Sequence, residues 1–215
     1  MEKKYKLTDE TINLNGATLY RIEALKDFGE IKKGDKGGFI ESENNLAHEG
    51  NAWVSDNARV YGDACVFDNA QVYGNAFVYG NAWASDNARL CGYAWVSDNA
   101  RVYGDANVCD DSSVFGNALV YDNARVYGDA LVRGYACVCG DAEISNKSDY
   151  IVFQNWWSSG RYFTWTRSNN MWSVGCFYGT GEELIKKAYK DSELSGREYE
   201  RIVKYVEEIR KENGK

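Results

Sequence analysis

The stretch Asp56-Asn57-Ala58-Arg59-Val60-Tyr61-Gly62-Asp63-Ala64-Cys65-Val66-Phe67 contains two copies of one six-residue pattern. The pattern reads turn, turn, small, variable, aliphatic, variable. It occurs sixteen times over residues 51–146 without an insertion or a deletion. A unit of six residues is too small to bury its own apolar face, so neighbouring units must stack on one another. The repeat therefore predicts an all-β solenoid.

Two positions of each hexad predict the core of this solenoid. The small position is Ala except at Ser112, and the aliphatic position is Val except at Ala84, Leu90 and Ile144. Because the two positions are two residues apart, their side chains lie on the same side of an extended strand. We expect both to point inward, and the variable positions to point outward.

The two residues before the small position predict a corner. The first is Gly ten times and Asp six times, and the second is Asn or Asp at fourteen of sixteen positions, with Tyr93 and Tyr135 as exceptions. These residue types tolerate positive φ or bond their own backbone in turns. A corner every six residues closes a three-sided coil after eighteen. The segment then makes a little over five coils, about 25 Å tall at the usual strand spacing.

The segment before the repeat, residues 1–50, predicts a β cap. Residues 11–14 and 17–22 have strand character and flank Asn15-Gly16, a strong signal for a two-residue hairpin. Glycines at 34, 37 and 38 indicate a second turn before Phe39. Such a cap would cover the open sheet edge of the first coil.

The segment after the repeat predicts a second cap and two helices. Residues 147–179 are rich in aromatic side chains and predict three short strands, with turns at 158–160 and 168–170. Residues 180–215 predict two amphipathic helices. The pairs Thr180 with Glu183 and Ser195 with Glu198 each have the spacing of a capping box, which marks a helix start.

The charge distribution argues against binding to duplex DNA. The chain of 215 residues has a net charge of −7, and its solenoid segment contains five Arg and no Lys against twelve acidic residues. Duplex DNA requires a basic surface. The sequence also lacks a signal peptide and an apolar run long enough to span a bilayer. We therefore expect a cytoplasmic protein that binds neither duplex DNA nor membranes.

The cysteines do not have the spacing of a metal site. There is no CxxC and no paired Cys/His spacing of the zinc type, so no metal or cofactor is predicted. Cys91 and Cys109 are one coil apart and should stack on one wall. In a reducing compartment we expect all six cysteines to be free thiols. They are Cys65, Cys91, Cys109, Cys137, Cys139 and Cys176.

Sorting the outward positions by eighteen residues assigns them to three walls. The first wall collects Tyr61, Phe77, Tyr79, Trp95, Phe115 and Leu131. The second collects Phe67, Trp83, Tyr103, Leu119, Tyr121 and Cys139. The third is polar, with Gln71, Tyr73, Arg89, Asn107, Arg125 and Tyr127. Exposed aromatic patches mark interfaces, so the two apolar walls predict a homo-oligomer, either a dimer or a trimer. Coverage of one wall by the C-terminal helices is the alternative.

The aromatic segment near the C-terminus contains candidate binding residues. Aromatic faces next to guanidinium groups suit the stacking of a base and the binding of a phosphate, or the anchoring of a partner protein. The alternative interpretation is a hydrophobic plug that closes the last coil. The candidates for a small anionic ligand or a host protein are Trp156, Trp157, Arg161, Trp165, Arg167 and Trp172.

The repeat resembles the left-handed parallel β-helix of hexapeptide-repeat proteins, in which a small residue follows an aliphatic one by four places, as Ala64 follows Val60. The left-handed coil is implied by this resemblance. Many such proteins are acyl-CoA-dependent transferases with a histidine general base. The one histidine here, His48, lies in the N-terminal cap, and no loop interrupts the coils. Acyl transfer is therefore an alternative and not the main interpretation.

The flanking segments are similar to proteins of unassigned activity encoded by bacteriophages and prophages. The resemblance rests on the stretches Gly37-Gly38-Phe39-Ile40-Glu41-Ser42, Trp156-Trp157-Ser158-Ser159-Gly160-Arg161 and Gly175-Cys176-Phe177-Tyr178-Gly179-Thr180-Gly181. It implies a phage setting, in which small proteins block host defences by binding a protein or sequestering a nucleotide signal. We expect a non-catalytic binding protein of this kind, with a purely structural or assembly protein as the alternative.

Overall fold

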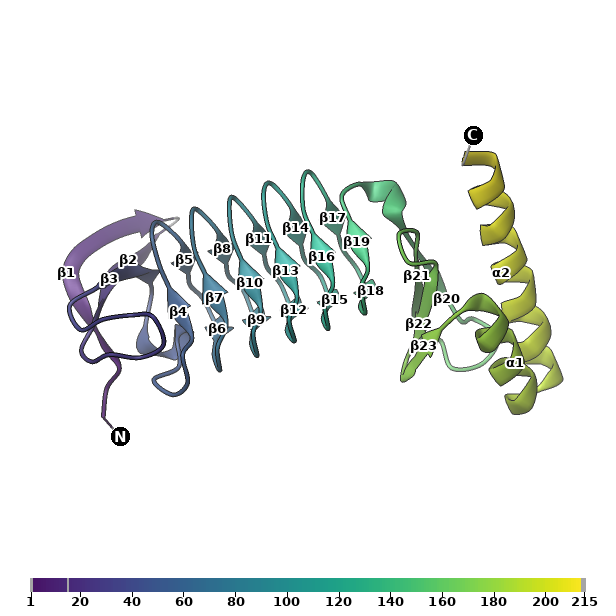
Figure 1. Cartoon of the computed structure of the whole chain (residues 1–215), viewed down its shortest axis with the longest axis horizontal. Coiled ribbons are helices and arrows are strands. Elements are labelled where there is room, and N and C mark those ends of the chain that lie inside the picture. Colours follow the sequence, from purple (N-terminus) through teal and green to yellow (C-terminus); the bar gives the residue numbers. More distant parts are fainter. Residues whose placement is uncertain (1, 15, 214–215) are drawn as a thin grey trace.

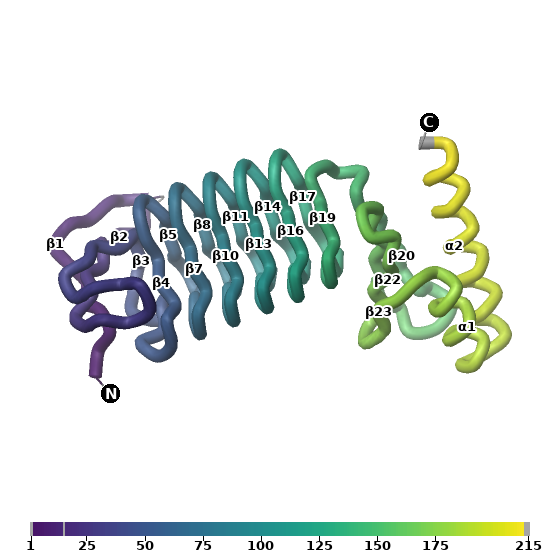
Figure 2. The backbone as a smooth tube through the Cα atoms, in the orientation of Figure 1, coloured from purple at the N-terminus to yellow at the C-terminus, as the bar shows by residue number. Residues whose placement is uncertain are grey.

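The computed structural model describes residues 2–14 and 16–213. Figure 1 and Figure 2 show an elongated molecule in which a β-solenoid lies between an N-terminal sheet and a C-terminal sheet followed by two helices. The two ends of the chain lie at opposite ends of the molecule (Figure 1). The solenoid, the two caps and the helix pair predicted from the sequence are confirmed.

The solenoid has three walls of two-residue strands, and neighbours on a wall are eighteen residues apart in sequence. Wall A contains β5 (Arg59–Val60), β8 (Phe77–Val78), β11 (Trp95–Val96), β14 (Ser113–Val114) and β17 (Leu131–Val132). Wall B contains β6 (Cys65–Val66), β9 (Trp83–Ala84), β12 (Arg101–Val102), β15 (Leu119–Val120) and β18 (Cys137–Val138). Wall C contains β4 (Trp53–Val54), β7 (Gln71–Val72), β10 (Arg89–Leu90), β13 (Asn107–Val108), β16 (Arg125–Val126) and β19 (Glu143–Ile144).

The predicted inward register is confirmed. All small and aliphatic positions of the hexads are buried, and equivalent positions pair across parallel strands, as Val96 does with Val78 and Val114. Ser112, the one small residue that is not Ala, is also fully buried, and its Oγ donates to the carbonyl of Cys109 at 2.6 Å. The hydroxyl therefore has a partner although it replaces a methyl group in the core.

The corners have the backbone conformation that their residue types predicted. All ten first-position glycines have positive φ, and so do all six aspartates, with φ between 54° and 60°. Asp also has a second role that the sequence did not reveal. The carboxylate of Asp56 accepts the amide N–H of Gly74 in the next coil at 2.9 Å, and Asp98 accepts from Gly116 at 3.0 Å. The acidic corners thus join successive coils.

The N-terminal cap consists of β1 (Tyr5–Leu14), β2 (Ala17–Ala24), β3 (Lys36–Ile40) and a 3₁₀ helix over Glu43–Asn45. Strands β1 and β2 form the predicted hairpin. Gly16 in its turn has φ +89°, whereas Asn15 lies outside the described residues. Strand β3 runs parallel to β5 and joins the cap to wall A. Inside the cap, the Lys4 ammonium is buried and donates to the carbonyl of Ala52 at 2.8 Å.

The C-terminal cap is an antiparallel sheet of four strands, where three were predicted. The strands are β20 (Tyr150–Gln154), β21 (Tyr162–Thr166), β22 (Met171–Val174) and β23 (Phe177–Gly179). The sequence interpretation missed the turn at Gly175, whose φ is +59° and which separates β22 from β23. Strand β21 packs against β18 of the last coil, so this sheet covers the end of the solenoid.

The two helices are α1 (Gly181–Asp191) and α2 (Glu193–Asn213). The predicted capping box of Thr180 and Glu183 is confirmed. The second predicted box is wrong, because α2 begins before Ser195, and Ser192 Oγ instead accepts the Ser195 amide at 3.0 Å. The pair Asn213-Gly214 predicts the end of this second helix, and Gly214 lies outside the described residues. Within the described part of the chain, no helix has the length and apolar character needed to cross a membrane.

The core register predicts very different costs for substitutions at two adjacent positions of β14. Val114 is fully buried, whereas Ser113 lies on the outer face and is partly exposed. Val114→Asp should lower the free energy of unfolding by about 3–5 kcal/mol, because it buries an unpaired carboxylate. Ser113→Asp should lower it by about 0.5 kcal/mol or less. Equal urea midpoints for the two variants would contradict the register. The pair Val96 and Ser97 is less suitable for this test, because Ser97 points outward but is only 7% exposed.

The hydrogen bond of Thr164 predicts that a valine variant at this position is less stable than a serine variant. This residue is fully buried, and its Oγ1 accepts the Cys137 amide of the last coil at 2.8 Å. Thr164→Val leaves that N–H without an acceptor and should cost about 1–3 kcal/mol. Thr164→Ser keeps the oxygen and should be the more stable variant in urea unfolding, although valine buries more carbon. A valine variant as stable as the serine variant would mean that this hydrogen bond does not hold the cap.

Lys4 predicts a pH dependence of stability. Burial, with a smaller contribution from the charge of Lys26, lowers the pKa of Lys4 from 10.5 to about 8. The unfolded chain then binds more protons than the folded one between about pH 8 and pH 10, so this group makes the free energy of unfolding rise with pH in that window. Lys4→Met should remove the rise. Urea titrations of both proteins across the window measure it, and identical slopes would rule out a buried Lys4.

Candidate functional site

The predicted aromatic binding residues are divided between a core and a surface. Trp165 and Trp172 are buried and pack with Phe163 against Leu184 and Val203 of the helices. Because both side chains are at most 2% exposed, the structure places these two predicted binding residues in the core between the sheet and the helices, out of reach of a ligand. They form the core between the C-terminal sheet and the helices, whereas Tyr150 and Val152 are the cap residues that pack against the core of the solenoid.

The other four candidates lie at different places. Trp156 is 75% exposed, while Trp157 is partly buried against Tyr199, with ring centroids 5.0 Å apart. Arg161 and Arg167 flank opposite ends of β21, which separates them by about 20 Å at the usual rise of a strand. The structure therefore does not bring the two arginines into one site.

Arg161 lies in a cleft of about 530 Å³ between the C-terminal sheet and the helix pair. One side is formed by the turn between β20 and β21 and by the turn between β22 and β23. The other side is formed by the end of α1 and the beginning of α2 (Figure 1). The lining includes Asn155, Arg161, Phe177, Lys187, Asp191 and Tyr199. The volume is within the range of small-molecule sites.

Hydrogen-bond donors in this cleft include Arg161, Lys187 and Tyr199. In the described part of the chain, the Arg161 guanidinium has neither an ion pair nor a side-chain hydrogen bond, and the Lys187 ammonium lies 5.3 Å from the centre of the Phe177 ring. The Tyr199 hydroxyl oxygen accepts from Asn155 Nδ2 at 3.2 Å, which leaves its O–H to donate. Burial raises the pKa of Tyr199, so this proton is retained at neutral pH.

Wall A presents a connected set of aromatic rings. Tyr61 stacks on Tyr79 at 5.1 Å, Tyr79 meets the edge of Trp95 at 6.2 Å, and Phe77 contacts Trp95 at 5.4 Å. Trp95 is 48% exposed. Phe115, also predicted for this surface, is partly exposed two residues after Ser113 of β14. The helices pack on the C-terminal sheet and do not cover this wall (Figure 2).

Wall B carries its aromatic residues as two separate pairs. Phe67 meets Trp83, which is 43% exposed, and Tyr103 stacks on Tyr121 at 4.9 Å. At the end of this wall, Ser173 of the C-terminal sheet donates to the Cys137 thiol at 3.1 Å. The hydrogen bond from Cys139, opposed by burial, lowers the pKa of Cys137 to about 6. The last coil of wall B thus contacts the cap.

Wall C contains a disulfide between Cys91 and Cys109, whose Cα atoms are 4.6 Å apart. The expectation of six free thiols is therefore wrong for this pair, although the predicted stacking is confirmed. Parallel strands of successive coils bring outward residues eighteen apart within bonding range.

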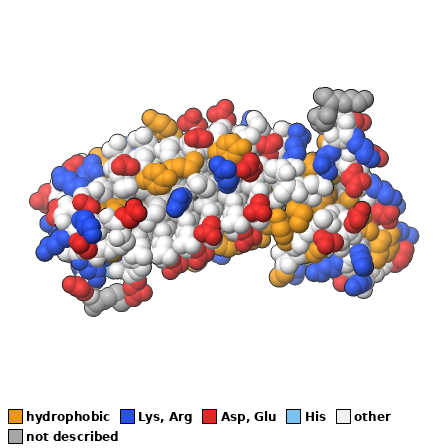
Figure 3. Space-filling model, viewed as in Figure 1, with side chains coloured by type: hydrophobic (Ala, Val, Ile, Leu, Met, Phe, Trp, Pro, Cys, Tyr) orange, Lys and Arg blue, Asp and Glu red, His pale blue; other side chains and the backbone are white. Residues whose placement is uncertain are grey.

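Figure 3 shows that acidic side chains follow the solenoid and that basic ones gather mainly at its two ends.

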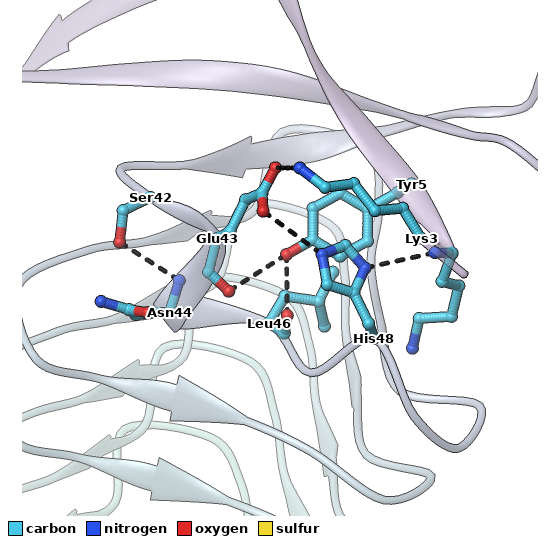
Figure 4. Close-up of polar contacts among 8 residues, drawn as sticks. Lys3, Tyr5, Ser42, Glu43, Asn44, Leu46 and His48 are labelled. Atoms are coloured by element: carbon cyan, nitrogen blue, oxygen red, sulfur yellow. Dashed lines mark hydrogen bonds and ion pairs between the residues drawn. The ribbon is translucent and has the colours of Figure 1, made fainter. Parts of the chain in front are cut away.

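His48, the candidate general base of the acyltransferase alternative, lies inside the N-terminal cap (Figure 4). Its ring stacks on Tyr5 at 4.3 Å, and its Nδ1 accepts the Lys4 amide at 3.2 Å. Its Nε2 faces the Glu43 carboxylate at 3.5 Å, and that carboxylate also binds Lys3 at 2.6 Å. Through these contacts His48 holds the beginning of β1 against the 3₁₀ helix of the same cap.

Sequence reasoning missed most of the cleft. Lys187, Asp191 and Tyr199 come from the helices, where helical spacing alone predicted only which face is buried. Asn155 is buried in a turn, and its Oδ1 accepts the Ser158 amide at 3.0 Å. No linear spacing joins these residues to Arg161, because the sheet and the helices meet only in the folded chain.

The comparisons with known proteins bear on the solenoid. No curated protein gave a significant match. The family model described as the YdcK beta solenoid repeat matches residues 70–86 and 118–134. Both stretches lie within the solenoid, and each extends over strands from all three walls. The chain therefore contains β-solenoid repeats similar to those of this family.

Proposed function

We propose that this chain is a non-catalytic binding protein that uses wall A as a protein–protein interface, in the first place with further copies of itself. The observation that carries the proposal is the connected ladder of Tyr61, Tyr79, Trp95 and Phe77 on the outer face of wall A, in which Trp95 is exposed and the other three rings are partly exposed. Aromatic residues at the centre of a patch contribute most to binding. The neighbouring coils fix these rings in advance, which lowers the entropy cost of association.

Wall A fits this role better than wall B. Its four rings form one contiguous patch, whereas the rings of wall B form two separate pairs. A second copy related by a two-fold axis would place the same patch on both sides of the contact, as closed dimers require. A trimer would instead need a different surface on each side.

The wider role we propose follows from the resemblance to phage-encoded proteins. The chain would fold as a left-handed hexapeptide-repeat β-helix and act in the host cytoplasm as a counter-defence inhibitor that binds a host protein or a nucleotide signal. A purely structural or assembly protein is the second candidate, because an unbroken solenoid with one aromatic wall also suits assembly. Acyl transfer is less favoured, since both ring nitrogens of His48 face groups of the cap.

The interface predicts a wall-specific loss of self-association. In native mass spectrometry the wild-type protein should give an oligomer, whose mass is two or more times 24.3 kDa. Trp95→Ser should weaken the association by about tenfold or more, because it removes the central ring of the ladder. Trp83→Ser is the matched control, since it removes an equally exposed tryptophan from wall B.

Three outcomes separate the alternatives. Loss of the oligomer only with Trp95→Ser supports wall A. Loss only with Trp83→Ser assigns the contact to wall B and contradicts the proposal. A wild-type protein that is monomeric at all accessible concentrations rules out self-association, and wall A would then have to bind a different protein.

A further inference from the structure

We infer that the C-terminal cleft is a binding site for a small phosphate ester that carries free hydroxyl groups, such as a sugar phosphate or a mononucleotide. The site is separate from wall A, so it stands or falls independently of the proposed interface. The inference rests on which groups line the cleft and which of them lack partners.

The first step concerns the anion. Arg161 lines the cleft without an ion pair among the described residues, and Lys187 adds a second cation from α1. In the rest of the chain some cations are paired, as Arg125 is with Glu143 and Lys204 with Glu200. A guanidinium left free in a concave site is suited to a phosphate, because its fork of N–H groups matches two oxygens.

The second step concerns the remaining donor and its support. The Tyr199 hydroxyl is held by Asn155, whose own carbonyl oxygen is held by the Ser158 amide and hydroxyl at 3.0 Å. Asn155 is 4% exposed and Tyr199 is 7% exposed. This fixed pair positions one more O–H donor on the wall of the cleft. Three donors of this kind favour a ligand rich in acceptor oxygens.

The third step concerns the hydroxyl groups. Asp191 lines the same cleft, and no hydrogen bond or ion pair joins its carboxylate to another described side chain. A carboxylate beside a phosphate site repels the anion but accepts hydrogen bonds from hydroxyl groups of the same ligand. Carboxylates recognise ribose hydroxyls in this way in nucleotide-binding folds. The pair of Arg161 and Asp191 thus favours a molecule with a phosphate at one end and hydroxyls at the other.

Calorimetric titration of the full-length protein tests the inference. The probes are ribose 5-phosphate and adenosine 5′-monophosphate, with ribose and inorganic phosphate as the two halves of the recognised chemistry. We expect at least one of the phosphate esters to bind more tightly than either half. Tighter binding of the adenosine ester than of the sugar ester would identify the ligand class as nucleotides, and the reverse would identify it as sugar phosphates.

The variants assign the roles. Arg161→Met should weaken binding of the ester by about 10- to 100-fold, because it removes a charge-assisted contact. Asp191→Asn should weaken the binding of the ester and leave the binding of inorganic phosphate unchanged. Arg167→Met is the matched control, since this arginine lies at the other end of β21, and it should leave binding unchanged.

Alkylation of Cys176 gives a second measurement of binding that does not depend on calorimetry. This thiol is exposed and lines the cleft, so the bound ester should slow its reaction with iodoacetamide. The inference is overturned if neither ester binds, if Arg161→Met and Arg167→Met behave alike, or if inorganic phosphate binds as tightly as both esters. Circular dichroism of each variant separates loss of binding from loss of folding.

Discussion

The backbone hydrogen bonds between the strands of successive coils all point in one direction, and the rest of the molecule depends on that fact. Each coil donates its strand N–H groups to the carbonyls of the next coil, as Trp95 does to Ser112 at 2.9 Å and Ser97 to Val114 at 3.0 Å. The first coil is therefore left with free carbonyls and the last coil with free N–H groups. Unpaired backbone groups are costly once they are covered, so the two ends need caps of opposite chemistry.

The two caps meet this demand with different groups. The N-terminal cap supplies donors: the Phe39 amide binds the Ala58 carbonyl, Asn45 Nδ2 binds the Ala64 carbonyl, and the Lys4 ammonium binds the Ala52 carbonyl. These carbonyls belong to walls A, B and C respectively. The C-terminal cap supplies hydroxyl acceptors to the same three walls, for the amides of the last coil. They are Tyr150 for Arg133, Thr164 for Cys137 and Ser168 for Glu143.

The sequence predicted those parts of the fold that a local rule determines. The alternation of Ala and Val fixed the core, and Gly or Asp at each corner fixed the positive φ, because both depend on the residue and its near neighbours. The caps were predicted only in outline. Thr164 faces the last coil and Trp165 faces the helices because of the way in which the strands pair. No pattern in the linear sequence reveals that pairing. For the same reason the sequence joined Arg161 to Arg167, although β21 separates them.

The division between repeat and caps also separates two kinds of binding surface. The repeat positions that specify the fold point inward or lie at corners, so the outward positions of the walls are free to carry rings such as Trp95 without disturbing the coil. A wall built this way is flat, and a flat aromatic surface suits a protein partner. A small molecule needs a concave site, which arises where unlike elements meet. The C-terminal cap had to depart from the repeat in order to supply hydroxyl acceptors, and packing two helices against its sheet created the cleft that contains Arg161.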